Sequence, residues 1–218
     1  MCDDTDSEIS LPWITWDCGD MRIISGSLRG KKLHGIRGMA IRPTSDRVRE
    51  SIFNIISFHV RDALVLDMFA GTGALGIEAL SRGAASAMFV DKYHGALSVI
   101  ERNIRSCALG DRAKIIRWDI RKRLSPLIAS ESRFDFVFMD PPYNKNLIEP
   151  ALHKLHISHI LKKDARVIVE HSPSEPIPKE LAVPDEAPNS EGSVQVPFTI
   201  TDQRKYGKTL ASFLDYML

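Results

Sequence analysis

Apolar residues follow two alternating patterns over most of this 218-residue chain. Short, almost continuous apolar runs are typical of buried parallel strands, and they alternate with segments whose apolar residues recur every three or four positions, as in helices. The predicted strands are 63–67, 87–91, 114–117, 134–140 and 166–170. The predicted helices between them are 73–82, a helix through Ile100 and Ile104, and a helix near 146–162. This order predicts an α/β fold with a doubly wound, mostly parallel sheet.

The segments on either side of this alternation have different patterns. Upstream, residues 22–26 and 32–33 flank a basic turn and predict a small β-hairpin, and residues 44–60 predict a helix with one apolar stripe. Downstream, residues 172–192 contain five prolines, which predicts a mobile loop. Two final runs, 194–206 and 209–216, flank Gly207 and predict a closing antiparallel hairpin.

Charge is unevenly distributed, although the net charge is only +1. Residues 1–20 carry six acids and no Lys or Arg, which predicts a disordered acidic leader, and Met21 is an alternative start. Residues 22–61 carry nine Lys or Arg against two acids, so we divide the chain into 1–20, a basic extension 21–61 and an α/β domain 62–218. The basic extension is either a surface for phosphates or an ordinary solvated face. The residues expected to contact phosphates are Arg22, Arg29, Lys31, Lys32, Arg42, Arg47 and Arg49.

Cysteines and apolar runs exclude several classes of protein. The three cysteines are widely spaced and form neither a disulfide framework nor a metal-ligand pattern. The sequence shows no secretory signal and no apolar run near the ~20 residues that a membrane span needs. We therefore expect a cytoplasmic protein with no membrane association.

A glycine-rich turn follows the first predicted strand of the α/β domain. Gly71-x-Gly73-x-x-Gly76, with Asp91 about twenty residues further on, fits the fingerprint of nicotinamide and flavin sites. Asp67, however, ends the strand in the pattern Asp-x-Phe-x-Gly-x-Gly. A carboxylate there would repel a pyrophosphate but would suit a cationic amino-acid ligand. Together with a motif at 140–143, this favours a site for S-adenosylmethionine (SAM).

Four acids, Asp67, Asp91, Asp119 and Asp140, fall at or just after the ends of predicted strands, where doubly wound sheets bind their ligands. Helix capping or metal binding are competing roles, but no histidine lies at ligand spacing to these acids. We expect Asp67 near the amino-acid end of SAM, Asp91 at the ribose hydroxyls and Asp119 at the adenine amine. The predicted cofactor residues are Asp67, Phe69, Gly71, Gly73, Asp91 and Asp119.

The motif Asp140-Pro141-Pro142-Tyr143 follows the fourth predicted strand. The Asp140 carboxylate and the Pro141 carbonyl can each accept one N–H of an exocyclic amine on a nucleobase, which aims the nitrogen lone pair at a methyl donor. The prolines fix the backbone, and Tyr143 offers a face for stacking the base. The competing interpretation is a proline turn after a buried strand. Glu170, which ends the strand 166–170, is either a site carboxylate or only a strand-end residue.

These segments resemble one known family, the bacterial 16S ribosomal RNA guanine-N2 methyltransferases. The resemblance spans about 22–210 and rests on Arg42-Pro43-Thr44, on the glycine turn with its continuation to Ala84, on Asp140-Pro141-Pro142-Tyr143 and on Arg204-x-Tyr206-Gly207-x-Thr209. It implies a seven-stranded class I methyltransferase fold with SAM as donor. It also implies one guanine of 16S rRNA as target, in the small ribosomal subunit or its assembly intermediate. A monomer is expected.

Two alternatives stay open at this point. An adenine-N6 methyltransferase acting on DNA or RNA shares the Asp-Pro-Pro-Tyr motif, although no separate target-recognition domain is evident. A non-catalytic RNA-binding or ribosome-assembly factor could have kept the same fold.

Overall fold

The computed structural model describes residues 21–36, 44–130, 132–184 and 194–218. The predicted leader 1–20 and the predicted phosphate contact Arg42 lie outside these residues. The helices are α1 (Asp46–Ile56), α2 (Ala74–Ser81), α3 (His94–Ser106), the 3-10 turn Gly110–Arg112, α4 (Ser125–Ile128) and α5 (Ile148–Ile157). The strands are β1 (Leu64–Met68), β2 (Ser86–Asp91), β3 (Ala113–Arg117), β4 (Phe134–Met139), β5 (Leu161–His171), β6 (Glu180–Pro184), β7 (Val194–Tyr206) and β8 (Thr209–Tyr216).

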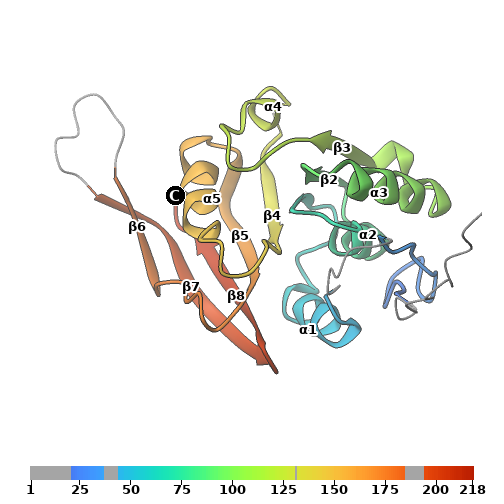
Figure 1. Cartoon of the computed structure of the whole chain (residues 1–218), viewed down its shortest axis with the longest axis horizontal. Helices are drawn as coiled ribbons and strands as arrows, with labels where there is room; N and C mark the ends of the chain where they lie inside the picture. The colour runs from blue at the N-terminus through green and yellow to red at the C-terminus, as the bar shows by residue number, and fades with distance from the viewer. Residues whose placement is uncertain (1–20, 37–43, 131, 185–193) are drawn as a thin grey trace, which may run out of the picture.

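The described residues form an eight-stranded sheet in the order β3-β2-β1-β4-β5-β8-β7-β6 (Figure 1). The first five strands in this order, β3-β2-β1-β4-β5, run parallel to one another. The last three, β8, β7 and β6, add antiparallel pairs. The predicted doubly wound α/β fold and its closing hairpin are therefore confirmed. The predicted starts of the first four strands differ from the observed ones by at most one residue.

The expected count of seven strands is wrong, and so is the predicted loop 172–192 over part of its length. Glu180–Pro184 forms β6, which pairs with β7. Leu181 and Val183 lie two residues apart on this strand, and both are buried in the core. Pro184 ends this edge strand, where a missing N–H is tolerated. The apolar alternation thus prevails over the proline content of the segment.

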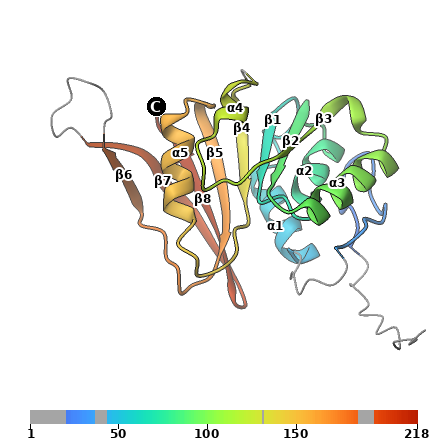
Figure 2. The same cartoon turned by 45° about the horizontal axis from the view of Figure 1, so that its top comes forward.

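Helices cover both faces of the parallel part of the sheet (Figure 2). On one face, residues of α1, α2 and α3 pack against Val65, Phe136 and Ile168. On the other, α4 and α5 pack against the neighbouring strand residues, such as Leu66 and Val137. Successive strand residues point to opposite faces, so buried strands need apolar side chains at nearly every position. This explains the continuous apolar runs of the sequence.

The segment before α1 is held on α2 rather than folded as a separate hairpin. Its predicted strands form only one bridge, between Arg22 and Lys32. The buried Glu78 carboxylate accepts the N–H groups of Ile24 at 2.8 Å and Ser25 at 3.0 Å. The basic extension thus shares the core of the α/β domain. No helix among the described residues combines the length and apolar character needed to cross a membrane.

Candidate active site

A cavity of about 490 Å³ opens at the carboxyl ends of β1, β2, β4 and β5. This is the edge at which parallel sheets of this kind bind ligands. The cavity brings together most of the predicted site residues: Asp67, Phe69, Gly71, Asp91, Asp119, Asp140, Pro141, Pro142 and Tyr143. Gly73 lies behind this lining. A Cβ there would come within 3.3 Å of Phe89 and Ile100, so the core packs directly against that part of the turn.

The turn between β1 and α2 is shaped by left-handed backbone conformations. The φ angles are 59° at Phe69, 54° at Gly71 and 77° at Gly73. At positions 71 and 73, glycine adopts such angles without strain. Asp91 supports this turn, because its carboxylate accepts the N–H of Gly71 and the N–H of Tyr93, each at 2.9 Å. Each carboxylate oxygen keeps a further acceptor position. Asp91 therefore holds two loops of the cavity and can still accept protons from ligand hydroxyl groups.

Asp67 lies beneath the same turn and is nearly inaccessible. Its carboxylate accepts the N–H of Gly76 at 2.9 Å. Burial raises the pKa of Asp67 well above its ordinary value, and the nearby carboxylates of Asp140 and Asp91 raise it further. A cationic ligand beside Asp67 would favour its ionised form and bring that pKa down.

Asp119 lines the cavity but already has a strong partner. Arg121 donates to both of its oxygens, with the shortest contact, from Nη2, at 2.6 Å. Hydrogen bonds from the Arg121 side chain hold the pKa of Asp119 below its ordinary value. An adenine amine would have to share this carboxylate with the guanidinium. The role of Asp119 at the adenine therefore stays a prediction.

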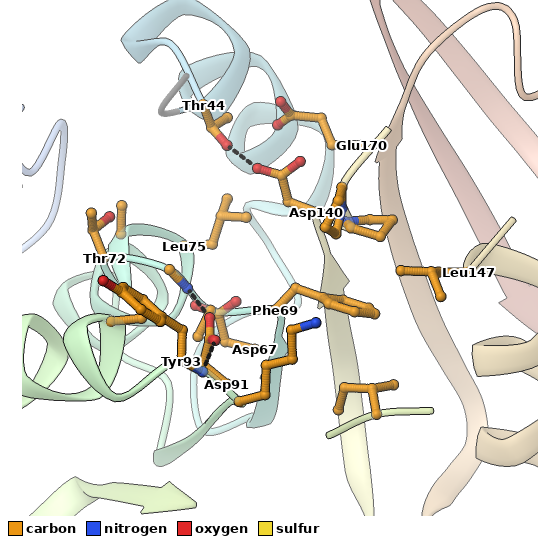
Figure 3. Close-up of a pocket in the computed structure, with 18 of the residues that line it drawn as sticks. Thr44, Asp67, Phe69, Thr72, Leu75, Asp91, Tyr93, Asp140, Leu147 and Glu170 are labelled. Carbon is orange, nitrogen blue, oxygen red and sulfur yellow. Dashed lines mark hydrogen bonds between the residues drawn. The ribbon is translucent and has the colours of Figure 1, made fainter. Parts of the chain in front are cut away.

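The Asp140–Tyr143 turn follows β4 and lies at the other end of the cavity. Figure 3 shows the Asp140, Thr44 and Glu170 side chains together at one end, and Asp67, Asp91 and Tyr93 together at the other. Thr44 Oγ1 donates to Asp140 Oδ2 at 3.4 Å. Burial raises the pKa of Asp140 to about 7, against the lowering effect of this hydrogen bond. The Tyr143 hydroxyl lies 3.2 Å from the hydroxyl of Thr209.

Sequence reasoning missed Thr44, Tyr93 and Thr209, and it left Glu170 undecided. All four line the cavity, and Glu170 is buried at the end of β5. The sequence indicates Thr44 and Ser45 only as helix-capping residues. Ser45 does cap α1, because its side chain accepts the N–H of Val48. The strand-end rule that identified the four aspartates would also have selected Glu170. Among the described residues, no group of three or more His, Cys, Asp or Glu is arranged to hold a metal ion.

Four of the seven predicted phosphate contacts, Arg22, Arg29, Lys32 and Arg47, have exposed side chains. Lys31 is half-buried and donates to the Ser106 carbonyl.

The prediction is wrong for Arg49, whose side chain is fully buried. Its Nη2 donates to the Arg22 carbonyl at 2.6 Å and to Asp46 Oδ1 at 2.7 Å. This guanidinium therefore joins α1 to the preceding segment instead of facing a phosphate.

The sheet order, the glycine turn after β1 and the acids at the carboxyl edge define a class I SAM-dependent methyltransferase fold. The family model described as "Conserved hypothetical protein 95" matches residues 21–214. Ribosomal RNA small subunit methyltransferase D of Haemophilus influenzae is 34% identical over 73% of this chain and 82% of its own length. The Escherichia coli protein of that name is 36% identical over 70% of this chain and 75% of its own. The chain belongs to this family of ribosomal RNA small subunit methyltransferases.

Solved structures agree with the fold. The yhhF protein of Escherichia coli matches with a TM-score of 0.74 and 30% identity, over 91% of this chain and 99% of that one. A more distant protein, 15% identical, matches with a TM-score of 0.56 over 77% of this chain and 49% of its own. That protein was solved in complex with SAH, and at this distance the likeness shows the fold alone.

Proposed function

We propose that this chain transfers the methyl group of SAM to the exocyclic N2 amine of one guanine in 16S rRNA. The observation that carries the proposal is a single cavity with two chemically different ends. One end has the glycine turn and Asp91, and the other has the Asp140–Tyr143 turn (Figure 3). The names of the relatives in Haemophilus influenzae and Escherichia coli support ribosomal RNA as the substrate.

The residues at the glycine turn fit the proposed cofactor. The cavity volume of about 490 Å³ lies within the range of small-molecule sites. Asp91 would accept the ribose hydroxyl protons, and Asp67 would face the cationic amino-acid end. SAM supplies an electrophilic methyl group on a sulfonium.

The chemistry assigned to the protein is positioning and electrostatics. The amine of a nucleobase is a poor nucleophile, because its lone pair is delocalised into the ring. The Asp140 carboxylate and the Pro141 carbonyl would each accept one N–H, which localises the lone pair and points it along the cavity. The methylated nitrogen must then lose a proton. With a pKa raised to about 7, Asp140 is suited to accept it.

Glu170 supports guanine over adenine as the target. The edge of guanine that carries the amine also presents the N1–H donor, whereas adenine presents a bare N1 acceptor beside its amine. A second carboxylate at the same end of the cavity matches two neighbouring donors and would repel the lone pair of adenine N1 (Figure 3). We therefore place the guanine edge between Asp140 and Glu170.

We further propose that the partner is the small ribosomal subunit or its assembly intermediate, met in the cytoplasm by a monomer. Exposed Arg22, Arg29 and Arg47 would bind RNA phosphates. RNA-modifying enzymes usually act on unpaired, splayed bases, which suits a pocket next to Tyr143.

Labelled methyl transfer tests this proposal. Purified protein and labelled SAM are incubated separately with small ribosomal subunits lacking the modification, with naked 16S rRNA and with duplex DNA. We expect label in the subunits and none in DNA. Asp140→Ala should abolish transfer while SAM affinity by calorimetry stays within about twofold. Transfer to DNA would favour the adenine-N6 alternative, and absence of SAM binding by the wild type would favour a non-catalytic factor.

A further inference from the structure

The turn of the β7–β8 hairpin carries a group of cations outside the basic extension. Arg204, Lys205 and Lys208 are exposed there, around Tyr206 and Gly207. Arg204 is paired with Asp202 at 3.0 Å. Within the part of the chain that the structure describes, no ion pair involves Lys205 or Lys208. The tip of the hairpin, residues 204–208, therefore carries net positive charge at its exposed end.

This hairpin tip is fixed beside the mouth of the cavity. Thr209, the first residue of β8, lines the cavity and contacts the Tyr143 hydroxyl at 3.2 Å. Tyr206 forms a hydrogen bond with Ser51 of α1 through its hydroxyl. Figures 1 and 2 show the β7–β8 turn and α1 near the same end of the strands of the sheet. If the lysines served only to keep the hairpin end soluble, the contacts of Thr209 with Tyr143 and of Tyr206 with Ser51 would not be needed.

Cations from three separate segments thus lie near the base-binding end. Arg47 is exposed on α1, within the basic extension. Lys205 and Lys208 lie on the hairpin tip, and Lys145 is exposed just after the Asp140–Tyr143 turn. A nucleotide whose base enters the cavity leaves its two flanking phosphates at the mouth. Those phosphates leave the target base in opposite chain directions, so cations on separate segments around the mouth can bind both.

We infer that the hairpin tip is a further RNA-binding surface beside α1, which binds backbone phosphates flanking the target base. This inference rests on the proposed function, because RNA is the partner. Lys205 and Lys208 would act as point charges with no base specificity. They would contribute to the KM for the RNA substrate and leave the chemical step and SAM binding unchanged.

The test compares Lys205→Ala/Lys208→Ala with a matched control, Lys163→Ala. Lys163 is exposed near the opposite, amino end of β5. Two lost phosphate contacts should raise the KM for small subunits roughly tenfold and reduce the slope of log kcat/KM against log salt by about 1–2. The kcat and SAM affinity should stay within about twofold, and Lys163→Ala should match the wild type. Lys205→Glu/Lys208→Glu should weaken binding further.

An unchanged KM and salt slope in the double variant would overturn the inference. So would a loss of kcat together with SAM affinity, because that result indicates a structural role. Filter binding of small-subunit RNA without SAM separates this inference from the proposed function. If the wild type binds RNA but transfers no methyl group, the proposed function fails, and weaker binding by the double variant still supports the hairpin tip.

Discussion

Asp140→Asn should stabilise the protein and slow the enzyme at the same time. The substitution keeps the shape of the side chain and an acceptor oxygen, but it removes the ionisable carboxylate. Burial raises the pKa of Asp140 from 3.8 to about 7, so the folded protein resists ionisation that the unfolded chain accepts readily. The cost to the fold therefore grows as the pH rises from about 4 to about 7 and is constant above.

The size of this effect follows from the two pKa values. One pKa unit corresponds to about 1.4 kcal/mol, so a rise from 3.8 to about 7 sets an upper limit of about 4 kcal/mol. Asp140 lines an open cavity, and solvent there lowers the expected gain to roughly 1–3 kcal/mol at pH 8. For a chain of this size, each kcal/mol raises Tm by about 2–4 °C.

Urea unfolding at pH 5 and pH 8 measures the gain, with Asp164→Asn as control. Asp164 is exposed and has a φ of 59°, which asparagine tolerates, so that variant should stay within about 0.5 kcal/mol. Asp140→Asn should gain more at pH 8 than at pH 5. A loss of stability, or an equal gain at both pH values, would show that ionising Asp140 costs the folded protein nothing.

The same variant tests the chemical role of Asp140. For the wild type, kcat/KM should rise with pH through about 7, because only the ionised carboxylate is a strong acceptor for the amine N–H. Asp140→Asn should lower kcat/KM roughly 10–100-fold and abolish this rise, since the amide does not titrate. A variant that keeps the pH dependence of the wild type would assign the ionisation to another group.

Three further predictions concern other acids of the protein. Glu78→Ala should lower the free energy of unfolding in urea by about 3–5 kcal/mol, because it removes the ion pair to Arg82 and leaves the N–H groups of residues 24 and 25 without an acceptor. A loss below about 1 kcal/mol would contradict this anchoring role. Asp91→Ala should weaken SAM binding at least tenfold in calorimetry, and unchanged affinity would remove Asp91 from the cofactor site. Glu170→Gln should lower kcat/KM for small subunits about tenfold or more with SAM affinity unchanged, whereas full activity would leave Glu170 a strand-end residue.

The parallel strands and the catalytic edge were predictable because their physical requirements are local. A strand buried on both faces must be apolar at nearly every position, and each such run here ends close to an acid. Asp67, Asp91 and Asp140 therefore meet in one cavity as the topology predicts. The left-handed turn at 69–73 likewise needs glycine within a few residues.

The errors arise from contacts between distant segments. The burial of Arg49 depends on the Arg22 carbonyl, 27 residues away, as well as on Asp46. The sequence shows several cations near the start of a helix. It does not show that the Arg22 carbonyl accepts a hydrogen bond from one of them.

The same limitation applies to β6 and to three residues of the cavity. Strand β6 forms because β7 pairs with it, and the prolines of this segment do not reveal that pairing. Thr44, Tyr93 and Thr209 line the cavity from separate segments, so only the folded chain shows that they share one site.

Mass mapping of small-subunit RNA would show directly whether this protein methylates a guanine amine through Asp140. Subunits from a strain lacking this gene are treated with SAM and either the wild-type protein or Asp140→Ala, and the modified nucleosides are then identified by position. We predict one N2-methylguanosine, restored by the wild type and absent with Asp140→Ala. Methyl-adenosine, or an equal yield of methylguanosine with the variant, would contradict it.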